Sequence, residues 1–308
     1  RVGMGQGSVL RRVARGLAPV LSCLLAGALP APAQDRPTAR ENAAPAGLDS
    51  EHLFGFSEGT DIGVPFQPEG ELETIGRVGR QSGAYGAFTT TANLKYPLSP
   101  QWRIAPGIAF SSVNISGVPD LPDTSQFSFD HASFEIRWHP LEREGHPFGL
   151  TFVLTPYYGT IEPASGRAAD NYGAQFIAAF DRTLVPERAF AAVNVAYTLG
   201  RTRPWSDGLA ADSSLLVPSA AASVRLLPWL FVGAELRYLQ GYSGLAMQGL
   251  TDQALYAGPT FFMTFGRGVS LSGAFEPQLW GQATGAASGL DLVQFDRQQF
   301  KLRLAVDL

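Results

Sequence analysis

The chain is poor in cysteine and in charge, and beyond its N-terminal segment it has no long apolar run. A single Cys among 308 residues excludes a disulfide framework and a Cys-rich zinc site. Charged residues make up 16% of the chain, less than is typical of soluble domains, while glycine and aromatic residues are plentiful. After residue 33, no stretch reaches the roughly 18 uninterrupted apolar residues that a transmembrane helix needs. The composition therefore disfavours a disulfide-rich, zinc-binding or helical membrane protein.

The N-terminal segment has the features of an export signal. Arginines at positions 11–15 precede a short apolar stretch at 17–29, and Ala31-Pro32-Ala33 matches a small-x-small cleavage site. The apolar stretch is too short to span a bilayer, which disfavours a membrane anchor. We therefore expect residues 1–33 to be a signal peptide that is cleaved near Ala33.

The mature chain is expected to begin with a periplasmic N-terminal tail at residues 34–70. The first part of this stretch, to Ser50, is rich in Ala, Pro, Arg and Glu and shows no periodicity, as is typical of a flexible linker. Cleavage would also leave 19 of the 23 Lys and Arg residues against 27 Asp and Glu residues. This acidic excess disfavours a nucleic-acid partner.

From residue 71 to residue 308, apolar and polar residues alternate in successive segments. Between Phe300 and Val306, for example, every second residue is apolar and faces away from Lys301 and Arg303. The same alternation occurs at 102–111, 133–139, 193–200, 230–238 and 269–279. Period two is the signature of strands with one apolar and one polar face.

The spacing of these segments predicts an all-β fold, a transmembrane antiparallel up-and-down β-barrel of about twelve strands. Short turns alternate with longer polar links, which is typical of outer-membrane barrels. An even number of strands puts both termini in the periplasm, and a ring of ten strands stays an alternative. The expected strands are 71–80, 83–96, 101–114, 126–139, 148–161, 171–185, 189–203, 213–227, 230–243, 252–266, 269–283 and 295–308.

The polar faces carry charges of both signs, which suits a wet lumen. Burying so many charges in a dry core would cost too much desolvation free energy. Two roles stay open for these residues: they line an open pore, or they form a salt-bridge network that stiffens the barrel. The candidates are Glu135, Arg137, Glu235, Arg237 and Glu276.

Several stretches resemble known proteins. The C-terminal alternation that ends at Leu308 resembles the terminal strand of Gram-negative outer-membrane proteins, although that family usually ends in an aromatic residue. The stretch from His52 to Gly63, followed by Glu71-Leu72-Glu73-Thr74, resembles the start of uncharacterised proteobacterial outer-membrane barrel proteins, as do His146–Leu150 and Leu184–Pro186. The resemblance implies an outer-membrane location and a barrel fold, with outer-membrane lipid, lipopolysaccharide and the barrel-assembly machinery as partners. It implies no activity.

The stretch from His52 to Gly63 can be interpreted in two ways. Glu58 and Asp61 on a glycine-rich backbone would suit a cation-binding or docking loop, although the spacing does not match an EF-hand. The favoured interpretation is a periplasmic segment that caps the barrel mouth with its apolar residues. A periplasmic partner that binds through this segment is an alternative.

One arrangement suggests catalysis. His131 and Ser133 are two residues apart on an expected strand, so both face the same side, where an imidazole could activate a hydroxyl. Outer-membrane phospholipases and lipid A deacylases carry a similar His-x-Ser, usually followed by Asn, whereas Phe134 follows here. His131 and Ser133 also share the face of Glu135, which is assigned to the lumen rather than to lipid. A lumen histidine is therefore the favoured interpretation, and no catalytic residue, metal site or cofactor is expected.

These observations predict a narrow outer-membrane channel, porin-like, for passive passage of small solutes. A structural or docking barrel without an open pore is the alternative, and a lipid-acting hydrolase that uses His131 and Ser133 is a weaker one. The solute, and whether the pore is open or plugged, do not follow from the sequence.

Overall fold

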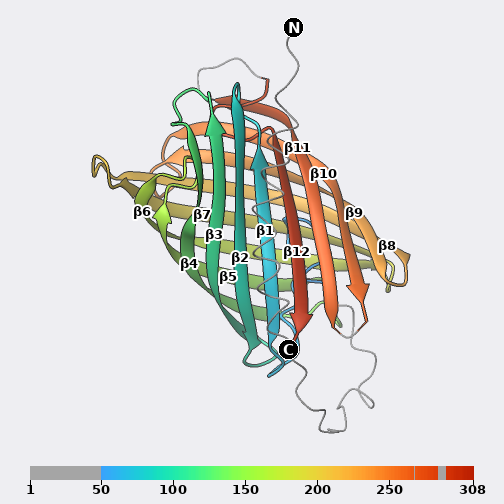
Figure 1. Cartoon of the computed structure of the whole chain (residues 1–308). Coiled ribbons are helices and arrows are strands. Elements are labelled where there is room, and N and C mark those ends of the chain that lie inside the picture. The colour runs from blue at the N-terminus through green and yellow to red at the C-terminus, as the bar shows by residue number, and fades with distance from the viewer. Residues whose placement is uncertain (1–49, 267, 284–288) are drawn as a thin grey trace. The chain divides into compact units, whose positions relative to one another are not determined.

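The computed structural model describes residues 50–266, 268–283 and 289–308, which form one closed β-barrel (Figure 1). Neighbouring strands in the sequence pair antiparallel, and β1 pairs with β12 to close the ring. The predicted up-and-down barrel of about twelve strands is therefore confirmed. The strands are β1 (Glu69–Val78), β2 (Ala84–Pro97), β3 (Trp102–Ser116), β4 (Thr124–Leu141), β5 (Gly149–Ile161), β6 (Ala168–Val185), β7 (Ala189–Pro204), β8 (Ala211–Leu227), β9 (Leu230–Ser243), β10 (Leu250–Phe265), β11 (Val269–Ala283) and β12 (Gln298–Asp307).

The predicted signal peptide and the stretch 34–49 of the predicted tail lie outside the described residues. Within the described part of the chain, no helix has the length and apolar character needed to cross a membrane.

The two ends of the barrel differ in their connections. The end at which β1 begins and β12 ends carries the tight turns at 98–101, 186–188 and 228–229, and we call it the short-turn end. In Figure 1 the label of the C-terminus marks it. The opposite end, the long-loop end, carries among others the loop from residue 289 to residue 297.

The strands place apolar side chains outside and polar ones inside, as their alternation predicts. In β3, Trp102 is 45% exposed on the outer face, whereas the next residue, Arg103, is 1% exposed on the inner face. Near the short-turn end, Trp102 stacks on Trp138 with ring centroids 5.9 Å apart, and Trp138 stacks on Phe152 at 5.7 Å. Such an outward aromatic cluster beside an apolar band is typical of barrels that cross a bilayer.

Strand boundaries lie close to the predicted ones, and the largest differences are at the starts of β6 and β12. β1 begins at Glu69, so that the barrel starts two residues before the predicted boundary at 71. β12 begins at Gln298 rather than at residue 295, because the preceding loop turns into the barrel: the Tyr256 hydroxyl donates a hydrogen bond of 2.5 Å to the carbonyl oxygen of Asp296.

Candidate functional site

Residues 50–62, which we call the inner segment, lie inside the barrel. Leu53 is fully buried, and Phe54 and Ser57 are each 1% exposed. The segment contacts strands all around the ring, at positions in the half nearer the short-turn end. Its side chains and backbone lie against residues of every strand: Glu69, Lys95, Arg103, Arg137, Thr151, Asp181, Asn194, Ser219, Glu235, Thr260, Ala274 and Arg303.

This arrangement differs from the tail predicted for residues 34–70. The described part of that stretch does not extend freely from the barrel, and its apolar residues do more than cap the mouth. The physical reason lies in the polar groups of the segment, which find partners on the barrel wall. The Thr60 hydroxyl, for example, donates a hydrogen bond of 2.7 Å to Asp181, and the carbonyl of Thr60 accepts one of 2.5 Å from Thr151.

The segment is held first through Glu51, whose carboxylate meets three cations of the wall. Arg103 donates from both terminal nitrogens, at 2.5 Å and 2.8 Å, and Lys95 donates at 2.9 Å. The nearest nitrogen of Arg137 lies 3.3 Å away. Burial opposes ionisation of Glu51, but these three cations outweigh it and hold the pKa of Glu51 well below its usual value.

A second anchor is Glu235 on β9, which binds the middle of the segment. Its carboxylate accepts hydrogen bonds from the backbone N–H of Phe56 at 2.6 Å and of Ser57 at 2.5 Å, and from the Ser57 hydroxyl at 2.6 Å. The guanidinium of Arg237 stacks on the Phe56 ring, 3.6 Å from its centroid. An ionised carboxylate that accepts several N–H and O–H donors makes a strong attachment.

Gly55 allows the segment to pass close to the wall. A Cβ atom at this position would lie 2.4 Å from a carboxylate oxygen of Glu235, 2.7 Å from the Cβ of Ala274 and 2.8 Å from a methyl carbon of Thr260. These distances are shorter than van der Waals contact, so a side chain at Gly55 would push the segment away from β10 and β11.

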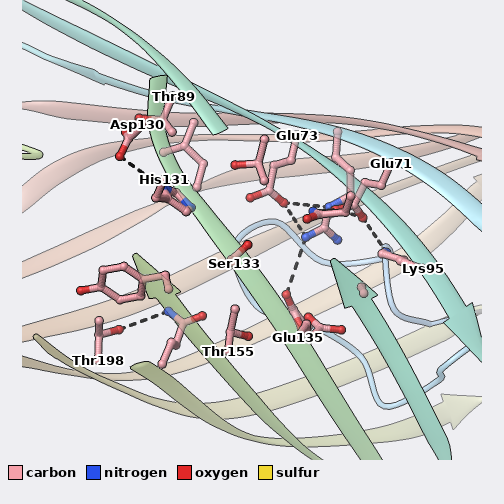
Figure 2. A pocket seen from close by; sticks show the side chains of 18 of the residues that line it. Glu71, Glu73, Thr89, Lys95, Asp130, His131, Ser133, Glu135, Thr155 and Thr198 are labelled. Carbon is pink, nitrogen blue, oxygen red and sulfur yellow. Dashed lines mark hydrogen bonds and ion pairs between the residues drawn. The ribbon is translucent and has the colours of Figure 1, made fainter. Parts of the chain in front are cut away.

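Beyond the inner segment, the barrel encloses a polar space. One cavity of about 440 Å³ has Glu51 and Glu58 among its lining residues. Its wall residues include Glu71, His131 and Thr198 (Figure 2). A second cavity of about 540 Å³ extends toward the long-loop end. Both are lined by Tyr157, Pro163, Asn171 and Thr198, so they adjoin each other inside the barrel.

The loop 289–297 narrows this space at the long-loop end. Asp296 is buried and forms an ion pair of 3.2 Å with Arg80, which also donates a hydrogen bond of 2.8 Å to the carbonyl of Val293. Burial raises the pKa of Asp296, although Arg77 and Arg80 act against it. Phe295 and Gln294 line the second cavity, so access from this end passes beside the loop.

The five predicted pore-lining residues all lie on inward-facing positions, and none is exposed. Arg137 bonds Glu58 of the inner segment and contacts Glu135 at 3.3 Å. Arg237 donates to Glu276 at 2.7 Å, and Glu235 holds the inner segment. Ion pairing therefore involves most of them, as the salt-bridge alternative predicts. That they line an open pore stays a prediction.

Sequence reasoning did not single out Glu51, Lys95, Arg103 or Arg303 as site residues. The alternation marks inward positions as polar, and three of these residues stand at such positions: Lys95, Arg103 and Arg303. They could therefore have been proposed as site residues. For Glu51 no signal was available, because it lies in a stretch without periodicity.

His131 and Ser133 also face the interior, where both line the first cavity (Figure 2). His131 Nδ1 lies 3.1 Å from a carboxylate oxygen of Asp130, and Asp130 in turn accepts a hydrogen bond of 2.5 Å from Ser111. This position agrees with a lumen histidine that has a polar partner. It gives no access to lipid outside the barrel.

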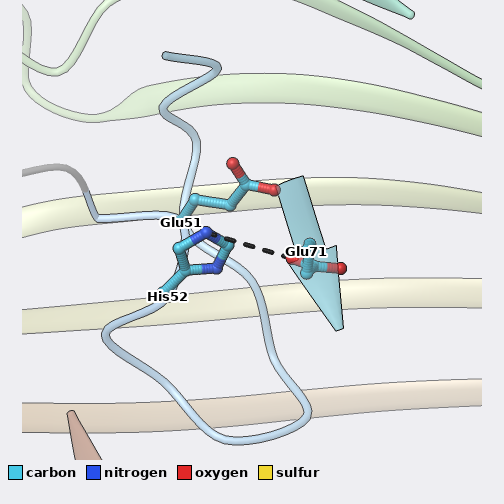
Figure 3. A group of neighbouring side chains, drawn as sticks. All are labelled: Glu51, His52 and Glu71. Carbon is cyan, nitrogen blue, oxygen red and sulfur yellow. Dashed lines mark ion pairs between the residues drawn. The ribbon is translucent and has the colours of Figure 1, made fainter. Parts of the chain in front are cut away.

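Glu51, His52 and Glu71 form a cluster whose ligand atoms lie within 4.8 Å of one another (Figure 3). Such a trio is the right size for a metal ion, but each member already bonds a cation. Arg303 donates to His52 Nδ1 at 2.7 Å, and Lys95 lies 2.5 Å from Glu71. A metal ion would compete with these groups and would be repelled by them, so the donor set favours a salt-bridge network.

The fold is that of the Gram-negative outer-membrane β-barrels. An outer-membrane channel from Pseudomonas putida F1 superposes with a TM-score of 0.56 at 12% identity, over 81% of this chain and 98% of that one. The β-domain of the Bordetella autotransporter BrkA superposes with a TM-score of 0.51 at 13% identity, over 79% of this chain and 99% of that one. No curated protein matches the sequence significantly.

The chain belongs to the family of unknown function DUF6662, whose model matches residues 46–308. The predicted resemblance to Gram-negative outer-membrane barrel proteins without a known activity is thereby confirmed.

Proposed function

We propose that this protein is a narrow outer-membrane channel for small solutes, whose lumen is closed at the short-turn end by the inner segment. The observation that carries the proposal is the pair of adjoining cavities that extend from the inner segment past Tyr157 and Asn171 toward the long-loop end. The similarity in fold to an outer-membrane channel agrees with this function.

The location is part of the same proposal. The chain is exported by the signal peptide at 1–33, cleaved near Ala33, and inserted by the barrel-assembly machinery. The outward apolar and aromatic residues, such as Trp102 and Trp138, support contact with outer-membrane lipid and lipopolysaccharide. The short-turn end then faces the periplasm, because short turns lie on that side in outer-membrane barrels.

Single-channel recording in a planar bilayer tests the channel. We expect the mature chain to show rare or no openings, and a variant that lacks residues 50–62 to show discrete, reproducible current steps. Gly55→Val provides a second way to displace the segment while leaving all strands intact. A folded barrel that stays silent in both variants would refute the channel.

A structural or docking barrel is the second candidate. The contacts of the inner segment with every strand favour it, because they stiffen the barrel as a whole. This candidate predicts no conductance in any variant, and a periplasmic partner that is lost when residues 50–70 are deleted. The hydrolase alternative predicts lipid hydrolysis that Ser133→Ala abolishes, and the inward position of Ser133 argues against it.

A further inference from the structure

The carboxylate of Glu51 is held as a bound ligand would be held. Two nitrogens of Arg103 donate to its two oxygens, which is the bidentate geometry that proteins use to recognise free carboxylates. Lys95 adds a third donor at 2.9 Å. We call Lys95, Arg103 and Arg137 the cationic cradle. All three side chains are at most 5% exposed.

The cradle offers more hydrogen-bond donors than Glu51 uses. Within the described part of the chain, Arg103 Nε is buried and makes no hydrogen bond. Arg137 Nη1 and Nε lie 3.3 Å from Glu51 and Glu135, without the alignment of a hydrogen bond. Buried guanidinium donors without a well-aligned acceptor are costly, and a bound anion is one way to satisfy them. The cradle therefore suits a carboxylate that approaches more closely to Arg137 than Glu51 does.

The charges of the wall also favour an anion. The ion-pair network around the cradle contains five cations of the barrel and four carboxylates of the barrel, so the wall alone carries one excess positive charge. The inner segment adds two carboxylates, Glu51 and Glu58. With the inner segment in place, the network thus contains six carboxylates and five cations. This excess of negative charge lowers the free energy needed to release Glu51. The wall groups are Lys95, Arg103, Arg137, Lys301 and Arg303, with Glu69, Glu71, Glu73 and Glu135.

A solute can reach this site from the interior space. Glu51, Lys95 and Arg137 are among the residues that line the cavity of about 440 Å³, which continues toward the long-loop end. A small carboxylate in that cavity would stand directly beside the bond between Glu51 and the cradle.

We propose that Lys95, Arg103 and Arg137 form a binding site for carboxylate-bearing solutes, and that Glu51 occupies this site as a built-in substitute for the solute. This inference rests on the proposed channel and names its substrate class. An entering carboxylate takes the place of Glu51 and weakens the attachment of the inner segment to β2, β3 and β4. Neutral solutes and chloride lack the paired oxygens that the cradle binds.

Titration calorimetry on the refolded full chain in detergent, with sodium acetate as the probe and sodium chloride at matched ionic strength, tests the site. We expect Glu51→Ala to bind acetate at least about tenfold more tightly than the unmodified chain, because the internal competitor is gone. A further Arg103→Met substitution should abolish this gain. Glu187→Ala is the matched control, since Glu187 is an exposed carboxylate whose side chain is 85% exposed at a turn.

Two further measurements test the carboxylate site if Glu51→Ala does not fold. Glu51→Gln keeps the size of the side chain and should also bind acetate more tightly than the unmodified chain. In the unmodified chain, acetate and not chloride should accelerate hydrogen exchange of the amides of residues 53–57. Equal acetate binding by folded Glu51 variants and the unmodified chain would overturn the proposal, as would exchange that acetate and chloride affect alike.

The outcomes separate this inference from the channel itself. Acetate binding by a barrel that never conducts would support the site and refute the channel. Conductance in the variant without residues 50–62, together with no acetate binding to any Glu51 variant, would support the channel and refute the site.

Discussion

Loss of the Glu235 side chain should release the inner segment without unfolding the barrel. This carboxylate accepts three hydrogen bonds from Phe56 and Ser57, all between 2.5 and 2.6 Å. A hydrogen bond to a charged group contributes about 1.5–3 kcal/mol, so the gross loss of three such bonds in Glu235→Ala is about 4.5–9 kcal/mol. Water that enters the space left by the side chain would satisfy part of the freed donors. We therefore expect a net loss of about 3 kcal/mol, or roughly a hundredfold in the docking equilibrium.

Native-state hydrogen exchange, measured peptide by peptide with mass spectrometry, reports this equilibrium directly. The amides of residues 50–62 should exchange roughly a hundredfold faster in Glu235→Ala, while the amides of the strands keep their protection. Glu235→Gln should have a smaller effect, because its amide keeps one acceptor oxygen. Glu187→Ala should exchange like the unmodified chain. Unchanged protection of residues 50–62 in Glu235→Ala would refute the assignment of Glu235 as an anchor, and so would an equal loss of protection throughout the barrel.

Three further predictions follow from the same contacts. Gly55→Val should displace the inner segment and increase conductance, because the valine side chain would meet Thr260 and Ala274. Gly266→Ala is the control and should leave the current unchanged, because a Cβ atom at that position would meet nothing within 4 Å. Arg103 and Lys95 hold the pKa of Glu51 below its ordinary value of 4.5, so the contribution of Glu51 to docking of the inner segment should be constant above pH 4.5 and decline as the pH falls below it. Glu51→Gln should weaken docking at neutral pH. In hydrogen exchange, this variant should also show a flatter dependence on acid pH than the unmodified chain. In a barrel that lacks residues 50–62, Glu235→Lys or Glu276→Lys should shift the reversal potential toward anion selectivity; unchanged selectivity would exclude both residues from the pore lining.

Much of the fold could be predicted because alternation is a local property. Leu230–Ser243 and Val269–Ala283 are strands with the predicted bounds, since apolar and polar residues alternate along much of each strand and turn residues stand at both ends. The same parity places Glu135, Arg137 and Glu276 inside. It does not say which carboxylate meets which cation, because those partners come from strands far apart in the sequence.

The sequence by itself determined the barrel and the polar character of its interior. A strand has a period of two, so the order of residues alone decides which side chains face lipid and which face the lumen. Only the tertiary structure decided what fills that lumen. Glu51 and Arg103 are 52 positions apart, and Ser57 and Glu235 are 178 apart. These pairs meet because closure of the ring brings all twelve strands around one bore, where a segment without periodicity finds polar partners on every side.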